Sequence, residues 1–241
     1  MTTVKKIIIT IFVIIGYQLI HQLLDINQTI LPSIDQIVIS FIQNFQSIAY
    51  NSMATIAETL VGLSIAIVLA LLLSIIINES KLLKAFVINF ISVIQIIPII
   101  AVAPLIIMWF GIGYESKVLL VIIYSVFSIV ITTTRAFSDI SNSHYLYIRS
   151  LTTNKYKMYR YLYFPLASNE IFSGIKIATT YSVVSAISGE YLGGKVGIGI
   201  LISRAYSSYQ TALVFALIAV IIAITFSLLA IVNRIEKMVI K

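Results

Sequence analysis

Long uninterrupted runs of apolar residues dominate the chain and are separated by short polar turns. Each run is roughly 17 to 25 residues long, enough for a helix to cross a hydrocarbon core of about 30 Å. The runs cover residues 7–24, 54–77, 86–110, 118–134, 171–189 and 211–233. They do not alternate apolar with polar positions, as the strands of a membrane barrel do. The pattern predicts an all-α, polytopic membrane protein with about six spanning helices in a single domain, residues 1–241.

The first and third runs carry additional signals. The first follows Lys5 and Lys6, as a signal peptide would, but no cleavage site of small residues is present, so an uncleaved helix is expected. The third run contains Pro98 and Pro104, which predict a kinked helix buried among its neighbours. The mixed segment 25–51 is expected to be a short connection outside the membrane.

Residues 137–170 are polar and rich in tyrosine, and no span can be placed there, which makes this the longest predicted loop. A helical pattern over 151–164 places Tyr156, Tyr159 and Tyr163 on one stripe. Such a helix either lies flat against the bilayer or docks into the groove of a partner, and composition leaves both alternatives open.

Composition supports membrane residence, since 60% of the 241 residues are hydrophobic, 10% are charged and the mean hydropathy is +1.05. The net charge is +7. With the N-terminus inside, every Lys and Arg except Lys117, Lys195 and Arg204 falls on the cytoplasmic side, as the positive-inside rule requires. The charge therefore predicts cytoplasmic N- and C-termini in the inner membrane, and nucleic acid is not expected as a partner.

The motifs of an enzyme are missing from the sequence. No phosphate-binding loop of the form G-x-x-x-x-G-K-[ST] occurs, because Gly193-Gly194-Lys195 has neither the spacing nor the hydroxyl residue. The chain has no cysteine, and His21 and His144 stand far apart. We therefore expect no catalysis, bound cofactor or metal site in this chain, and any ATP and Mg²⁺ would be used by another subunit.

Three ionisable residues fall inside or beside the spans, where a charge is costly unless it faces protein or water. Glu58, near the outer end of the second run, either reaches the headgroups or lines a pathway. Lys176 is explained by snorkelling to the cytoplasmic interface. Glu190, beside Gly189, either lines an outer vestibule or lies at a solvated helix end.

Four segments carry a family resemblance, and they follow one another over most of the chain. They are Ile30-Leu31-Pro32-Ser33, the proline-containing stretch from Ile97 to Gly113, Arg149-Ser150-Leu151 followed by Phe164-Pro165, and Gly189-Glu190-Tyr191-Leu192-Gly193 leading to Gly197-Ile198-Gly199. In this order they resemble the permease subunits of binding-protein-dependent ABC importers of the nitrate/sulfonate/taurine branch. The resemblance implies the bundle of a type I ABC importer permease.

In that family the cytoplasmic loop holds a coupling helix seated in a cleft of the ATPase subunit. The family's Glu-Ala-Ala corresponds to Leu146-Tyr147-Ile148 here, its glycine to Thr152 and its Leu-Pro to Phe164-Pro165. Because Thr152 resists the tight bend that a glycine allows, either the loop bends elsewhere or the partner cleft differs. The residues that the resemblance assigns to coupling are Tyr147, Ile148, Arg149, Leu151, Thr152, Lys157, Arg160 and Pro165.

The resemblance also implies partners: a second permease copy in a homodimer, an ATP-binding subunit, an extracytoplasmic solute-binding protein and the surrounding lipid. Its alternating-access mechanism makes Pro98, Pro104, Gly189 and Glu190 candidates for the translocation path. Residues 186–193 resemble permeases for the pyrimidine precursor of thiamine, and sulfonate, taurine and nitrate remain equal candidates. The alternatives are an ion-coupled secondary transporter or channel, disfavoured because the spans show almost no buried carboxylates, and a membrane scaffold.

Overall fold

The computed structural model describes residues 30–94 and 96–240, and the predicted first span, 7–24, lies outside them together with Lys5, Lys6 and His21. All regular elements in the described part are helices. They are α2 (Ile34–Gln43), α3 (Phe45–Asn78), α4 (Lys81–Ile94), α5 (Ile99–Phe110), α6 (Tyr114–Asp139), α7 (Asn142–Leu151), α8 (Lys155–Met158), the π-helical turn η1 (Tyr159–Tyr163), α9 (Phe164–Leu166), α10 (Ser168–Gly193), α11 (Ile198–Ser207) and α12 (Thr211–Val239).

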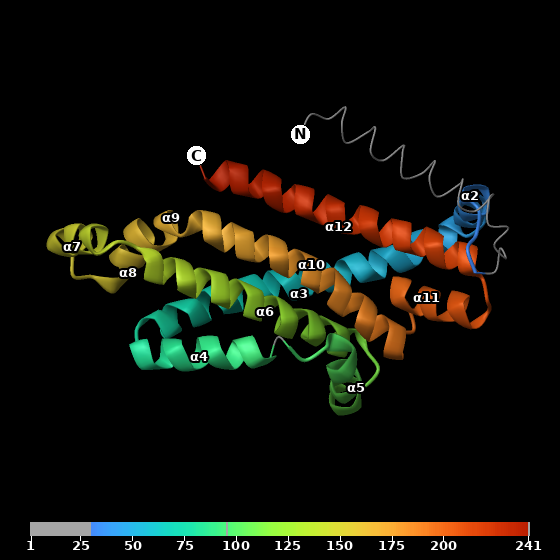
Figure 1. Ribbon diagram of the computed structural model, residues 1–241, viewed down its shortest axis with the longest axis horizontal. Helices are drawn as coiled ribbons and strands as arrows, with labels where there is room; N and C mark the ends of the chain where they lie inside the picture. The colour runs from blue at the N-terminus through green and yellow to red at the C-terminus, as the bar shows by residue number, and fades with distance from the viewer. Residues whose placement is uncertain (1–29, 95, 241) are drawn as a thin grey trace.

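Four helices, α3, α6, α10 and α12, run along the length of the bundle (Figure 1). Each of the four is long and apolar enough to cross a membrane. Helix α7 projects at one end of the bundle, while α2 and α11 lie at the other (Figure 1). We refer to these as the α7 end and the α11 end. The prediction of an all-α polytopic membrane protein is confirmed.

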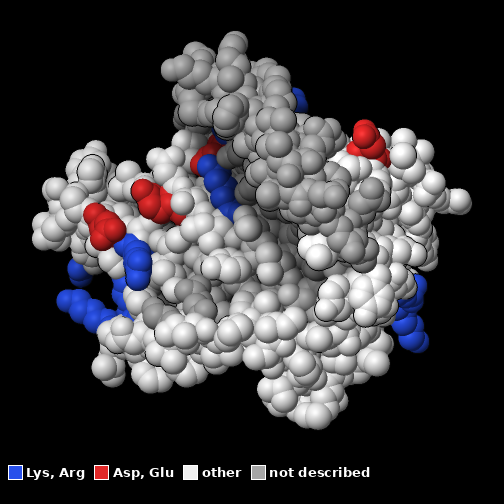
Figure 2. Space-filling view, turned by 45° about the vertical axis from the view of Figure 1, so that its right-hand side comes forward, with Lys and Arg blue, Asp and Glu red and all other residues white. Residues whose placement is uncertain are grey.

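Helix α6 lies at the centre of the bundle and packs against α3 and α10. Small residues allow the close approach, as is common between helices in lipid. A Cβ at Gly62 would lie 2.5 Å from Cγ1 of Val121, and one at Gly174 would lie 2.0 Å from Oγ1 of Thr132. Charged side chains are few in the described part of the face that Figure 2 shows, and many large apolar side chains of the bundle are exposed. The three helices thus form a close-packed core with an apolar exterior suited to lipid.

The second span begins earlier than the hydrophobic pattern predicts, because α3 starts at Phe45. The segment 25–51, predicted as a connection, is helical in most of its described part. Ser33 caps α2 with a capping box, in which its hydroxyl accepts from the Gln36 backbone and the Gln36 side chain accepts from the Ser33 backbone. Local capping therefore starts α2 within the segment that was predicted to be a connection.

The third run was wrongly predicted as one kinked, buried helix. The structure ends α4 at Ile94 and begins α5 at Ile99, with Pro98 at the N-cap in an extended conformation. A proline favours such a start, since it has no N–H to lose there and disfavours helix in the residue before it. Only one face of α5 is buried, through Ala103 and Ile106, whereas Trp109 is 65% exposed.

Candidate functional site

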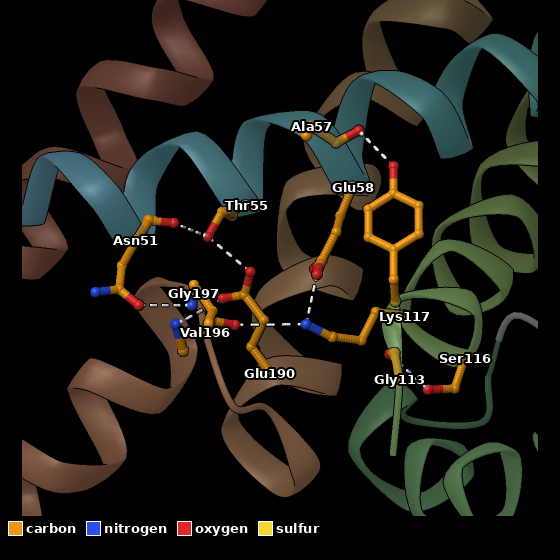
Figure 3. A network of polar contacts seen from close by, with 12 residues as sticks. Asn51, Thr55, Ala57, Glu58, Gly113, Ser116, Lys117, Glu190, Val196 and Gly197 are labelled. Carbon is orange, nitrogen blue, oxygen red and sulfur yellow. Dashed lines mark hydrogen bonds and ion pairs between the residues drawn. The ribbon is translucent and has the colours of Figure 1, made fainter. Parts of the chain in front are cut away.

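A cluster of polar side chains is buried near the α11 end, where α3, α6 and α10 meet the start of α11 (Figure 3). Its members are Asn51, Thr55, Glu58, Lys117 and Glu190, and none is more than 8% exposed. We call this set the buried polar cluster. Such groups are expensive to place among apolar helices unless they bond to one another.

An ion pair joins two of the long helices in this cluster. Glu58 on α3 accepts from the ammonium group of Lys117, in the first turn of α6 (Figure 3). The same ammonium donates to the backbone carbonyl of Val196 at 3.4 Å. The second oxygen of Glu58, Oε2, has no hydrogen-bond partner among the described residues. The pair thus links α3, α6 and the segment between α10 and α11.

Glu190, near the end of α10, holds the start of α11 in place. One carboxylate oxygen accepts from the hydroxyl of Thr55 at 2.7 Å, and the other accepts from the backbone N–H of Gly199 at 2.7 Å. The neighbouring N–H of Ile198 donates to Thr55 Oγ1 at 3.0 Å. The first N–H groups of a helix have no partner within the helix, so α10 and α3 together cap α11.

Gly197 makes this arrangement sterically feasible. Its φ of +126° lies in a region that L side chains rarely adopt, and its N–H donates to Oδ1 of Asn51 at 2.7 Å. A Cβ built on Gly197 would lie 2.1 Å from Cδ of Glu190. The carboxylate can therefore reach the start of α11 only because no side chain stands at position 197.

The structure changes several expectations for the charged residues. Glu58 does not reach the headgroups, and Glu190 is neither at a solvated end nor on an open vestibule, since both are almost fully buried. Lys117, which was expected on the outer side, is buried in an ion pair with Glu58. The ammonium group of Lys176 donates to Glu236, near the end of α12, at 2.7 Å, and its snorkelling to the interface stays a prediction. The signal that sequence reasoning missed was the pair of opposite charges, Glu58 and Lys117, near the ends of two predicted spans.

The four candidates for the translocation path do not share one surface. Gly189 and Glu190 are buried on α10, whereas Pro98 and Pro104 are exposed on α5. Helix α5 approaches α10 one turn further along, where a Cβ at Gly193 would lie 3.0 Å from Ile107. The path assignment therefore stays a prediction for these residues.

The second notable region is α7, which lies at the end of the bundle and has no buried residue (Figure 1). Ser141 caps it, its hydroxyl accepting from the backbone N–H of His144. Leu146, Tyr147 and Leu151 are 56%, 65% and 67% exposed. Three large apolar side chains on one short projecting helix form a surface suited to a partner.

Thr152 occupies an ordinary conformation at the end of α7. Its φ of −158° and ψ of 139° are extended and open to any residue. The expected strain of Thr152 in place of the family's glycine therefore does not arise, because the chain leaves α7 without a left-handed residue. The predicted helix 151–164 is split accordingly, with α7 ending at Leu151 and a second helical stretch beginning at Lys155.

This second stretch, α8 through α9, is fastened to the end of α3. The Lys155 ammonium donates to Glu79, whose other oxygen accepts from the Tyr159 hydroxyl at 2.9 Å. The bond from Lys155 lowers the pKa of Glu79, and burial raises the pKa of Tyr159 to about 12. Tyr159 and Tyr163 share the predicted stripe and stack at 4.8 Å, while Tyr156 is 71% exposed.

The model of one protein family, described as the binding-protein-dependent transport system inner membrane component, matches residues 62–241. The match includes three of the long helices, α6, α10 and α12, and about half of α3. The chain belongs to this family. The resemblance that the sequence motifs indicated is confirmed.

Curated relatives of this family member are permease proteins. The riboflavin transport system permease protein of Chloroflexus aurantiacus is 33% identical over 147 residues, 61% of this chain and 55% of that protein. The formylaminopyrimidine transport permease protein of Halalkalibacterium halodurans is 29% identical over 188 residues, 78% and 75% of the two chains. A putative aliphatic sulfonates transport permease protein of Bacillus subtilis is 25% identical over 214 residues, 88% and 78%. The last two matches span most of both proteins.

Proposed function

We propose that this chain is the membrane-spanning permease subunit of an ATP-driven importer, with the α7 end in the cytoplasm. In this proposal α7 docks on an ATP-binding subunit, which hydrolyses ATP with Mg²⁺, and an external binding protein delivers the solute at the α11 end. The observation that carries it is the projecting helix α7 with its exposed Leu146, Tyr147 and Leu151 in a chain of this family. The orientation rests on charge, since the described Lys and Arg residues are concentrated toward the α7 end.

The contacts of α3 support a route for transmitting motion between the two ends. At the α7 end, Lys155 and Tyr159 bond to Glu79, directly after the last residue of α3. At the α11 end, Glu58 on the same helix binds Lys117. Helix α3 is continuous over 34 residues, about 50 Å of helix. If docking displaces the loop that contains α7 and the stretch from α8 to α9, these bonds would therefore move α3 as a rigid element.

We also propose a homodimer and a nitrogen-heterocyclic solute. Many large apolar side chains of α5 remain exposed in the single chain, including Met108, Trp109 and Phe110, which is compatible with a second copy or lipid against this face. The riboflavin and formylaminopyrimidine relatives name nitrogen heterocycles as their solutes, and the sulfonate relative names the competing class. Growth on aliphatic sulfonates as the sulfur source, compared with uptake of a labelled aminopyrimidine, separates the two classes.

The docking role of α7 is tested by Leu151→Glu in the full transporter reconstituted in vesicles. A carboxylate on an apolar contact surface must be desolvated when the ATPase subunit binds, so uptake should fall at least tenfold while membrane insertion is unchanged. Leu82→Glu is the matched control, because Leu82 is 83% exposed at the start of α4 and lies outside α7.

Two measurements accompany uptake in this experiment: the amount of permease in the membrane and the ATPase activity that the solute and its binding protein stimulate. The proposal expects Leu151→Glu to lose the stimulated activity and Leu82→Glu to keep it. Normal uptake by the Leu151→Glu variant at normal abundance would reject α7 as the docking helix.

A further inference from the structure

A cavity of about 780 Å³ lies at the α7 end, between the end of α3 and the stretch from α8 to α9. It is separate from the exposed apolar side chains of α7. Its walls combine apolar residues from the last turns of α3 with tyrosines and two basic residues from the other side. The cavity is open to the surface, so a ligand can enter it from outside the protein.

The apolar wall lies where the hydrocarbon region should end. Ile75 and Ile76 belong to the last apolar turn of α3, and Asn78 and Glu79 follow directly. Ile76 is 58% exposed. A span that changes from apolar to polar over one turn marks the level of the lipid headgroups. The cavity therefore extends from the hydrocarbon edge into the headgroup layer.

The polar wall carries an uncompensated positive charge. Lys155 is neutralised by its ion pair with Glu79. Arg160 also lines the cavity, and no acidic side chain among the described residues lies within ion-pair distance of its guanidinium. The guanidinium lies instead over the ring of Tyr161, whose centroid is 5.9 Å from Cζ. One free guanidinium with its planar set of N–H donors fits a phosphate.

The aromatic residues of the cavity are also those expected at a membrane interface. Tyr156 is 71% exposed and lines the cavity with Arg160, and Phe164 belongs to the same wall. Tyrosines are enriched at headgroup level because the ring is apolar and the hydroxyl is polar. An occupant with an anionic head and apolar chains would satisfy both walls of the cavity together.

We propose that this cavity binds the headgroup of an anionic phospholipid, with the phosphate on Arg160 and an acyl chain along Ile75, Ile76 and Phe164. Of the two alternatives left open for the helix predicted over 151–164, this proposal takes contact with the bilayer for the stretch from α8 to α9, while α7 is the docking helix of the proposed function. The proposal does not depend on the solute or on the ATPase partner.

The test measures lipid binding to the full chain in detergent by native mass spectrometry, with phosphatidylglycerol and phosphatidylcholine titrated separately. Phosphatidylglycerol should bind the wild type at least fivefold more tightly than phosphatidylcholine, and Arg160→Gln should remove most of that difference. Lys157→Gln is the matched control, since Lys157 is an exposed basic residue of α8 that does not line the cavity. It should retain the preference.

Three results would overturn the proposal. The first is equal retention of phosphatidylglycerol by the Arg160→Gln and Lys157→Gln variants. The second is release of the lipid by millimolar inorganic phosphate, which would identify a free anion as the ligand. The third is loss of ATPase-subunit capture in the Arg160→Gln variant with unchanged lipid binding, which would assign this surface to a protein partner.

Discussion

Replacing Lys117 by methionine should destabilise the bundle more than any other single change of a charged residue in its described part. Met approximates the length of the lysine side chain and removes its charge. The change leaves Glu58 and Glu190 buried, at 2% and 0% exposure, without the ammonium group that faces Glu58. Removing one partner of a buried ion pair typically costs about 3 to 5 kcal/mol.

That cost is large compared with a total folding free energy of about 5 to 15 kcal/mol. For a chain of this size, 1 kcal/mol corresponds to roughly 2 to 4 °C in the unfolding midpoint. We therefore expect Lys117→Met to lower the midpoint by about 6 to 20 °C, measured by tryptophan fluorescence of the purified chain in detergent. Lys195→Met is the control, because Lys195 is exposed in the nearby loop between α10 and α11.

A double variant separates the ion pair from the packing of the side chains. Glu58→Gln combined with Lys117→Met removes both charges, so it should be more stable than Lys117→Met alone, with at least half of the lost midpoint recovered. A Lys117→Met midpoint within about 2 °C of the wild type would refute the reasoning. A double variant less stable than Lys117→Met alone would contradict the claim that the loss comes from the unpaired Glu58 carboxylate.

Two further predictions concern a backbone position and a titration. Gly197→Ala should reduce the free energy of unfolding by more than about 2 kcal/mol, since φ is +126° and the new Cβ would meet Cδ of Glu190. Gly113→Ala is the control, because its new Cβ meets only the end of the Glu115 side chain. Equal unfolding midpoints for the two variants would contradict the predicted difference. The lowered pKa of Glu79 means that its ion pair with Lys155 stabilises the fold above the ordinary pKa of 4.5 and that this contribution is lost as the pH falls through the lowered value. Because Glu79 is 39% exposed, the free energy of unfolding of the wild type should exceed that of Glu79→Gln by less than about 1 kcal/mol at pH 7. A difference that did not shrink as the pH was lowered below 4.5 would count against the assignment.

The spans were predictable because hydrophobic run length is a strong signal, and the second, fourth, fifth and sixth runs lie within α3, α6, α10 and α12. The ends of these helices were less predictable. Helix α3 starts at Phe45 and α10 ends at Gly193, each beyond the apolar run, because tertiary contacts such as those of Asn51 and Glu190 extend the helices into polar sequence. Helix α11 was missed, since it is only ten residues long and lies outside the six apolar runs.

The third run shows the limit of hydrophobicity as a guide. Residues 86–110 are long and apolar enough for one span, yet α4 and α5 are separate helices. Both prolines were noted in the sequence and interpreted as kinks. A proline at a helix start is an N-cap and one inside a helix is a kink, and the sequence did not show where α5 starts. Pro98 lies at the N-cap of α5, while Pro104 is accommodated within it.

The buried polar cluster also changes how the transporter classes are distinguished. Ion-coupled transport was disfavoured because buried carboxylates were expected to be almost missing from the spans, and that premise is wrong: Glu58 and Glu190 are both buried in them. Yet most of their bonding capacity is used within the fold, by Lys117, by Thr55 and by the backbone at the start of α11. A carboxylate that caps a helix or binds a lysine already has a structural role, so its burial alone does not indicate an ion pathway. Family membership and the exposed face of α7, rather than a count of buried charges, favour the ATP-driven class.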